Sequence, residues 1–306
     1  MIEIRVKNYS LNNSKRQPWY TVNWLENELS KCGVDVRIVN SFTEQSKLKI
    51  AAFSIKNLFF KEGDIYLLTF PLYSLKDIGL RELRLIFKYP QNFILIFIAV
   101  FIPKWKIRNE KCIVLSENGL RFVNPNSYYI FPLKIDLNNL SEVDKYYDYC
   151  YFGPPYLTRG FEDVVRFVQK NRHLKFLFLL RPDRQFTPVE NELIEKIKEE
   201  PSANVIIEFM DYDKLILKIS ECNNFLLPFP LVMSEGPTVL YEALLHGHVL
   251  TTSNSGISRD LIEMGVVDIL GRQRTTRNFN PALGEVISFM KSKNKELVKY
   301  LCDEVL

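Results

Sequence analysis

Residues 224–252 read NFLLPFPLVMSEGPTVLYEALLHGHVLTT, and they predict a strand, a helix and a second strand in succession. The apolar runs 224–229 and 248–252 are short and are bounded by turn-forming residues, as buried strands usually are. Between them, Pro237 favours the first turn of a helix because its missing N–H would have no partner there. The stretch therefore predicts a β-α-β unit, and such units build parallel sheets.

The same alternation of apolar runs and amphipathic segments continues on both sides of this unit. The apolar runs are nearly continuous and alternate with helical segments, which indicates parallel sheets covered by helices on both faces. The predicted strands are 2–6, 34–40, 64–70, 93–102, 112–116, 128–132, 148–153, 174–180, 203–209, 224–229 and 248–252. The predicted helices are 19–33, 43–60, 75–89, 160–171, 190–200, 211–222, the helix that begins at Pro237, 258–265 and a tail from Pro281.

The chain length and one polar segment divide this alternation into two parts. A chain of 306 residues exceeds the usual size of one hydrophobic core. The segment 136–147 is polar and contains no predicted strand before the alternation starts again. We therefore expect an α/β protein with two doubly wound, Rossmann-like domains and a cleft between them. The first domain spans 1–140, the second spans 141–285, and a C-terminal helix at 286–306 can pack back on the first.

The composition excludes several classes of protein. With 47% hydrophobic and 25% charged residues, the chain is typical of a globular protein and not of a disordered one. The first ten residues contain charges where a signal peptide has its apolar core, so we expect no signal peptide. The most apolar run, 93–102, is far shorter than the roughly 20 residues of a membrane-spanning helix. Five dispersed cysteines without a C-x-x-C pair fit free thiols, and we expect a cytoplasmic protein.

Positive charge is concentrated in the first half of the chain. Residues 1–145 contain 21 Lys and Arg against 14 Asp and Glu, whereas the remainder contains 19 against 22. This excess can be simply the solvated surface of a lysine-rich domain. It can also mark contact with an anionic partner, such as a lipid head group, a phosphate or a nucleic acid. Peripheral attachment to a membrane surface therefore stays open.

The start of the helix at Pro237 is the strongest candidate site. In open α/β sheets, ligands bind beyond the C-terminal ends of the strands, where helices begin. The amides of Thr238 and Val239 would point into that crevice with the positive end of the helix dipole behind them, which suits a diphosphate. Glu242 lies further along the helix and could accept two hydrogen bonds from a ligand rich in hydroxyl groups. Alternatively, Glu235 is only a favourable first-turn acid and Glu242 a solvated helix residue.

Residues 234–265, SEGPTVLYEALLHGHVLTTSNSGISRDLIEMG, resemble the donor-site signature of family-4 glycosyltransferases. The segments 129–136 (YIFPLKID) and 152–168 (FGPPYLTRGFEDVVRFV) are similar to the end of that family's first domain and the start of its second. The likeness is collinear over about residues 128–270. It implies the two-domain GT-B fold, a nucleotide-sugar donor, and transfer with retention of anomeric configuration and without a metal ion.

The resemblance also implies roles for individual residues. Glu242 resembles the acid that holds the nucleotide ribose, and Arg159 takes the place of the basic residue that contacts the diphosphate. Phe209 and Met210 lie where the base of the nucleotide packs. Glu235 resembles the acid near the donor sugar, and together with Arg159 it makes up the implied catalytic pair. The implied donor-binding residues are Gly153, Arg159, Phe209, Met210, Ser234, Gly236, Pro237, Thr238, Val239 and Glu242.

The chain departs from the family's pattern at several positions. Glu235 and Glu242 are seven residues apart where the family has eight, so a strict alignment puts Ser234 in place of the first acid. Pro154 stands where the family has an arginine, and residues 1–140 contain no histidine. Two alternatives therefore stay open. One is a degenerate relative that binds a nucleotide or a partner without transfer, and the other is a nucleic-acid-binding protein that uses the basic half.

We expect a glycosyltransferase that moves a sugar, most simply a hexose, from a nucleotide-sugar to an acceptor. The sequence does not identify the acceptor, and lipid-linked substrates and glycans are both candidates. Lys15, Arg16 and Trp19, which follow the first predicted strand, are the candidates for its side of the cleft. Asp211 and Asp213 form an Asp-x-Asp pair, but at a helix start these residues are better suited to capping than to metal binding. We therefore expect no metal ion, no cofactor and no nucleic-acid partner.

Overall fold

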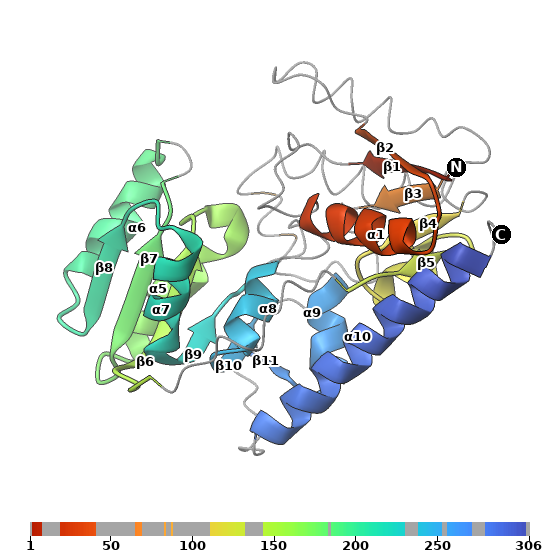
Figure 1. The fold of residues 1–306 in the computed structure, drawn as a ribbon. Coiled ribbons are helices and arrows are strands. Elements are labelled where there is room, and N and C mark those ends of the chain that lie inside the picture. The colour runs from red at the N-terminus through yellow and green to blue at the C-terminus, as the bar shows by residue number, and fades with distance from the viewer. Residues whose placement is uncertain are drawn as a thin grey trace.

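Two parallel sheets organise the protein, whose structure is a computed structural model (Figure 1). The structure describes residues 2–7, 19–40, 65–68, 83, 87, 111–131, 143–182, 185–229, 238–252, 256–270 and 279–303. The boundary predicted between two domains lies mostly outside these residues. None of the described helices is long and apolar enough to cross a membrane.

The first sheet has the strand order β2-β1-β3-β4-β5, and every neighbouring pair is parallel. Its strands are β1 (Ile2–Lys7), β2 (Val36–Asn40), β3 (Ile65–Leu68), β4 (Cys112–Val114) and β5 (Tyr128–Tyr129). Helix α1 (Trp19–Lys31) connects β1 to β2 and buries Val22, Leu25 and Leu29 in the core of this sheet. These positions are spaced by three and four residues, so they form one face of the helix. A short 3-10 helix, η2 (Asn118–Phe122), follows β4.

The second sheet has the strand order β11-β10-β9-β6-β7-β8 and is also parallel throughout. Its strands are β6 (Tyr147–Gly153), β7 (Phe176–Leu180), β8 (Ala203–Ile207), β9 (Cys222–Leu226), β10 (His248–Thr251) and β11 (Val267–Ile269). This is the order of a doubly wound Rossmann sheet, and it reverses between β6 and β9. Connections on the two sides of that point lead to opposite faces of the sheet.

Helices cover both faces of the second sheet because its strands are apolar on both sides. Along β6 and β7, successive side chains point to opposite faces and belong to two different apolar clusters. Tyr151 and Phe178 pack in the cluster of α5 and α6, whereas Phe152 and Leu179 pack in the cluster of α7, α8 and α9. These elements are η4 (Leu157–Arg159), α5 (Phe161–Lys170), α6 (Pro188–Lys198), α7 (Tyr212–Ser220), α8 (Thr238–Leu244) and α9 (Gly256–Glu263).

The last helix, α10 (Phe279–Asp303), lies alongside both sheets (Figure 1). Met290 in its first half belongs to the core of the second sheet, and Leu297 and Leu301 in its second half belong to the core of the first. Between them, the Asn294 side chain accepts a hydrogen bond from the Phe131 N–H at 2.9 Å and donates one to the Phe131 carbonyl at 2.9 Å. Phe131 follows β5 but is buried in the core of the second sheet. The pair therefore connects the two sheets.

Replacing Asn294 by alanine is expected to destabilise the protein by about 2–3 kcal/mol, because both backbone groups of the buried Phe131 lose their partner. Thermal and denaturant unfolding of the two proteins measure this loss. Lys295→Ala is the control, since Lys295 is exposed on the same helix. A loss below about 0.5 kcal/mol for Asn294→Ala, the range of an ordinary surface substitution, would contradict the role of the pair.

The α/β fold with parallel, Rossmann-like sheets is confirmed. The described elements match their predicted ranges within a few residues at each end. Strand β11 is absent from the prediction, because a three-residue strand centred on Asp268 gives no apolar run. The helix predicted at 43–60 and the strand predicted at 93–102 lie outside the described residues, and so does the helix predicted at 75–89 except for residues 83 and 87, which are helical. Helix α10, expected at 286–306 or in the tail from Pro281, begins at Phe279.

Candidate functional site

The candidate site lies at the C-terminal ends of β6 and β9, where the strand order of the second sheet reverses. The chain leaves β6 toward α5 on one face and leaves β9 toward α8 on the other. In doubly wound folds, connections that diverge in this way leave a crevice above the strand ends, and ligands bind there. Gly153 at the end of β6 and Phe229 beyond β9 mark its two sides.

The connection after β6 has a defined shape. The buried Tyr151 hydroxyl donates a hydrogen bond to the Pro154 carbonyl at 2.7 Å, which fixes the start of the connection to the strand. Burial raises the pKa of Tyr151, an effect that the charge of Arg159 opposes, so the hydroxyl keeps its proton and remains a donor. The connection ends at Gly160, whose φ of +77° lies in the left-handed region that glycine adopts without strain.

Arg159 reaches back from this connection over the strand ends. One of its guanidinium nitrogens would lie 3.3 Å from a Cβ built on Gly153, so glycine leaves room for it. On the other side, its guanidinium carbon lies 5.9 Å from the centre of the Phe229 ring, within the range of a cation–π contact. The structure thus brings together Gly153 and Arg159, two of the residues implied by the sequence. A cation that lies across the switch point is suited to an anionic ligand.

Phe229 is a component of the site that the sequence analysis missed. Its position as the last residue of the predicted strand 224–229 identified it only as the end of an apolar run. The Phe229 ring reaches Arg159 because β9 pairs with β6 in the sheet. The order of the strands in a sheet cannot be inferred from the sequence of one strand. The only available signal was its location at the C-terminal end of a strand, next to a helix start.

Helix α8, on the other side of the crevice, has one face in the core. Leu240, Tyr241 and Leu244 are buried there, and Val239 packs against the same cluster. Glu242, by contrast, is only half-buried. This exposure is compatible with both interpretations of Glu242, as a ligand for hydroxyl groups and as a partly solvated residue.

Phe209 and Met210 follow β8, two strands away from β6 at the edge of the same sheet. The Phe209 side chain is 59% exposed, and an apolar ring left in water at a strand end is available for stacking. Met210, by contrast, packs against the core cluster that also contains Leu240 and Tyr241. Of the two, Phe209 is therefore the residue free to contact a flat ligand.

Several predicted site residues lie outside the described part of the chain. They include the residues of the turn before α8 and two residues of the predicted acceptor side. Trp19 and Thr238 begin α1 and α8, and the structure describes their backbone only. The residues outside the described ranges are Lys15, Arg16, Ser234, Glu235, Gly236 and Pro237.

His246 and His248 lie away from the crevice, at the end of the sheet where the parallel strands begin. His248 begins β10 and lies 3.0 Å from the Asp268 carboxylate. Burial and the nearby Lys145 ammonium lower the pKa of His246 to about 4, so it is neutral at physiological pH. Lys145 itself donates hydrogen bonds to the carbonyls of His246 and Cys222. These contacts therefore stabilise the end of the sheet opposite the candidate site.

The Asp-x-Asp pair occupies the start of α7. Asp211 is the N-cap residue with an extended backbone, although its side chain makes no capping hydrogen bond, and Asp213 lies in the first turn. An acid in the first turn stabilises a helix through its dipole. Within the described residues, no three or more His, Cys, Asp or Glu side chains converge as a metal site would require.

Comparison with solved structures identifies the architecture. HepE from Anabaena in complex with UDP and glucose matches with a TM-score of 0.53 and 13% identity, covering 98% of this chain and 99% of that chain. HepE in complex with UDP matches with a TM-score of 0.51 and 13% identity, covering 99% and 100%. AviGT4, a glycosyltransferase involved in avilamycin A biosynthesis, matches with a TM-score of 0.48 and 12% identity, covering 99% and 95%. No protein-family model and no curated protein sequence matches the chain. The chain has the GT-B fold expected from its sequence.

Proposed function

We propose that this protein is a glycosyltransferase that moves a hexose from a nucleotide-sugar to an acceptor with retention of anomeric configuration. The observation that carries the proposal is the guanidinium of Arg159, held between Gly153 and the ring of Phe229 at the switch point. In a doubly wound sheet this is where a ligand's phosphates bind. HepE, which shares the fold, binds UDP and glucose, and this supports a nucleotide-sugar as the ligand here.

In the proposed complex, Arg159 binds the diphosphate of the donor. Its planar fork can donate two parallel hydrogen bonds to phosphate oxygens. Negative charge grows on the diphosphate as the bond to the sugar breaks, so the same cation stabilises the transition state more than the ground state. The backbone amides of the turn 236–239 would receive the remaining phosphate oxygens at the start of α8.

The rest of the donor would extend from the switch point to both sides. Glu242 on α8 would accept hydrogen bonds from the ribose hydroxyls, for which its half-buried position is suitable. The exposed Phe209 ring would stack on the base beyond β8. Glu235, in the turn before α8, would orient the sugar and stabilise the positive charge that develops on its ring.

The reaction then needs few further groups. The bond between the anomeric carbon and the phosphate oxygen breaks, and the bond to the acceptor oxygen forms on the same face of the sugar. The departing phosphate takes the proton of the acceptor hydroxyl. Closure of the first domain, proposed as residues 1–140 and bearing Lys15, Arg16 and Trp19, over the second, residues 141–285, would exclude water and limit hydrolysis of the donor. The basic first domain would suit an anionic acceptor or a lipid-linked one at a membrane surface.

Titration of the protein with UDP, GDP and ADP by calorimetry in the presence of EDTA tests the donor site. We expect one nucleotide to bind without a metal ion and Glu242→Ala to weaken that binding by about tenfold to a hundredfold, the effect of losing charge-assisted hydrogen bonds. Glu195→Ala is the matched control, because Glu195 is an exposed glutamate on α6.

Transfer and hydrolysis assays with the corresponding nucleotide-sugars then test for turnover. Release of the nucleotide from the sugar supports an enzyme, and binding without release would contradict the transferase and leave a nucleotide-binding relative. If no nucleotide binds, or if Glu195→Ala weakens binding as much as Glu242→Ala does, the proposed donor site is wrong.

A further inference from the structure

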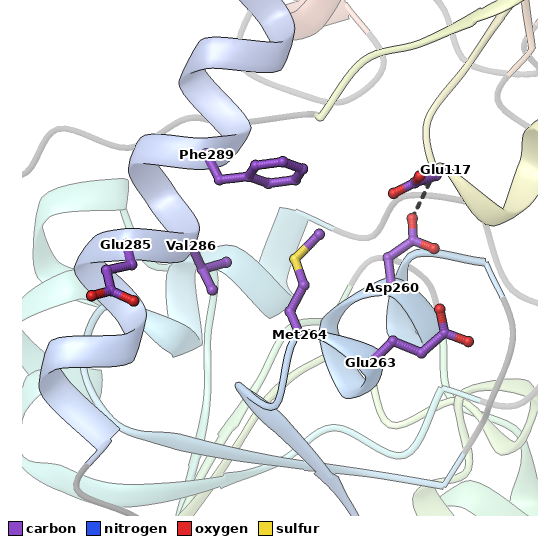
Figure 2. Close-up of a pocket in the computed structure, with 7 residues that line it drawn as sticks. All are labelled: Glu117, Asp260, Glu263, Met264, Glu285, Val286 and Phe289. Carbon is purple, nitrogen blue, oxygen red and sulfur yellow. Dashed lines mark hydrogen bonds between the residues drawn. The ribbon is translucent and has the colours of Figure 1, made fainter.

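One buried carboxylate joins the two sheets. Asp260 on α9 accepts hydrogen bonds from the backbone N–H groups of Glu117 at 2.7 Å and Asn118 at 3.1 Å, which lie at the start of η2 after β4 of the first sheet. Figure 2 shows Asp260 directed at Glu117, with the bond drawn as a dashed line. Asp260 is only 4% exposed, so protein atoms shield most of its carboxylate from water. Two residues more than 140 positions apart are thus joined by one side chain.

The surroundings of this carboxylate favour its neutral form. No basic side chain in the described ranges forms an ion pair with Asp260, and the carboxylates of Glu117 and Glu263 lie nearby. Burial is the largest cause that raises the pKa of Asp260, to about 6, and repulsion from Glu117 and Glu263 adds to it. The two amide hydrogen bonds act in the opposite direction, because they stabilise the carboxylate, but they are outweighed.

Protons can reach Asp260 through a pocket of about 420 Å³ that its side chain lines. The walls of the pocket come from Glu117 beside the first sheet, from Glu263 and Met264 at the end of α9, and from Phe289 on α10 (Figure 2). Since the walls belong to elements of both sheets, the pocket widens or narrows when the two parts of the molecule move relative to each other.

We propose that Asp260 and the amides of Glu117 and Asn118 form a proton-sensitive junction between the two halves of the molecule, which is firmest when Asp260 is protonated. The junction would regulate how readily η2 separates from α9, and therefore how readily the cleft opens. The inference does not depend on the proposed transferase activity, because it concerns only the opening of the junction.

The direction of the effect follows from linkage. In the closed junction the pKa of Asp260 is about 6, whereas a carboxyl group that opening exposes to water has the ordinary value of 3.8. Between these two values the closed form binds the proton more tightly than the open form does. Lowering the pH through about 6 therefore favours closure, and raising it leaves an unfavourable buried charge that favours opening.

The other titratable groups around Asp260 do not reproduce this behaviour. Burial raises the pKa of Tyr129 to about 12 and also raises the pKa of Tyr241, so both phenols stay neutral between pH 5 and pH 7. Glu263 is exposed and forms an ion pair with Arg259 at 2.8 Å. Within the part of the chain that the structure describes, the titratable groups that face the junction are Glu117 beside η2, Tyr129 on β5, Tyr241 on α8, Arg259 and Glu263 on α9, and Glu285 and Glu296 on α10.

Hydrogen exchange of the Glu117 and Asn118 amides at pH 5 and pH 7, each corrected for its intrinsic rate, tests the junction without any nucleotide. In the wild-type protein we expect protection about tenfold greater at pH 5, which is what a carboxyl pKa of about 6 in the closed form gives. Asp260→Asn cannot ionise and can accept only one of the two amide hydrogen bonds, through its Oδ1, so its protection should be lower than in the wild type but equal at both pH values. Glu195→Gln is the control, because Glu195 is an exposed glutamate on α6 that does not face the junction, and it should behave as the wild type does.

Small-angle scattering of the same proteins measures the domain movement. The wild type should become more compact between pH 7 and pH 5, and Asp260→Asn should not change. Equal amide protection in the wild type at both pH values would overturn the proposal even if Asp260→Asn fails to fold. The same tenfold change in a folded Asp260→Asn, or an unchanged scattering curve in the wild type, would overturn it as well.

Discussion

With UDP as the bound nucleotide, as in the HepE complex, replacing Arg159 by alanine is expected to weaken binding by about a hundredfold, because the lost charge-assisted hydrogen bonds would together stabilise a bound diphosphate by roughly 3 kcal/mol. The guanidinium lies over Gly153 and against the Phe229 ring, at the point where the second sheet reverses its order. Truncation leaves the diphosphate without this cation. Donor turnover should fall at least as far as binding, since the charge on the diphosphate grows in the transition state. Calorimetry with UDP measures the first loss, and a transfer or hydrolysis assay measures the second.

The binding of uridine separates this role from a structural one. Uridine has no phosphate, so its affinity should be equal in the wild type and in Arg159→Ala if the site keeps its shape. Arg159→Lys should recover only part of the UDP affinity, since an ammonium group keeps the charge but not the planar fork. Arg166→Ala is the control, because Arg166 is exposed on α5 and pairs with Asp163. UDP affinity that is unchanged in Arg159→Ala, or an equal loss for UDP and uridine, would contradict a diphosphate contact.

The sequence predicted the fold and the region of the site because both depend on local patterns. The apolar run 174–180 became strand β7, since a strand buried on both faces needs no alternation of polar residues. The region around Gly153 and Arg159 was implied by the family resemblance alone. The structure then showed that this region lies at the switch point, because only the strand order β9-β6-β7 shows where the order of the sheet reverses.

The features that the sequence did not predict depend on contacts between distant residues. Asp260 bonds to the backbone amides of Glu117 and Asn118, and an amide gives no signal in the sequence because almost every residue has one. The same is true of Asn294, whose partner is the backbone of Phe131. Such contacts become visible only once the two sheets lie side by side.

Replacing Gly247 by alanine is expected to destabilise the protein by about 3 kcal/mol, the cost of forcing a close backbone contact apart. Gly247 lies in the turn from α8 to β10, next to the start of β9. A Cβ at this position would lie 2.2 Å from the Asn223 carbonyl oxygen and 3.1 Å from the Phe225 ring. The Asn223 oxygen belongs to backbone that pairs in the sheet, so it cannot rotate away as a side chain would. Thermal and denaturant unfolding measure the loss.

Gly284→Ala is the matched control, and it should change stability in the opposite direction. Gly284 lies within α10 and is exposed, and a methyl group added there would have no neighbouring atom within 4 Å, so the alanine meets nothing. Alanine in a helix interior is more stable than glycine by up to about 1 kcal/mol, because glycine loses more backbone freedom on folding. The same chemical change should therefore destabilise the protein at position 247 and stabilise it at position 284. Equal effects at the two positions would mean that the close approach of Gly247 to the backbone of β9 is wrong.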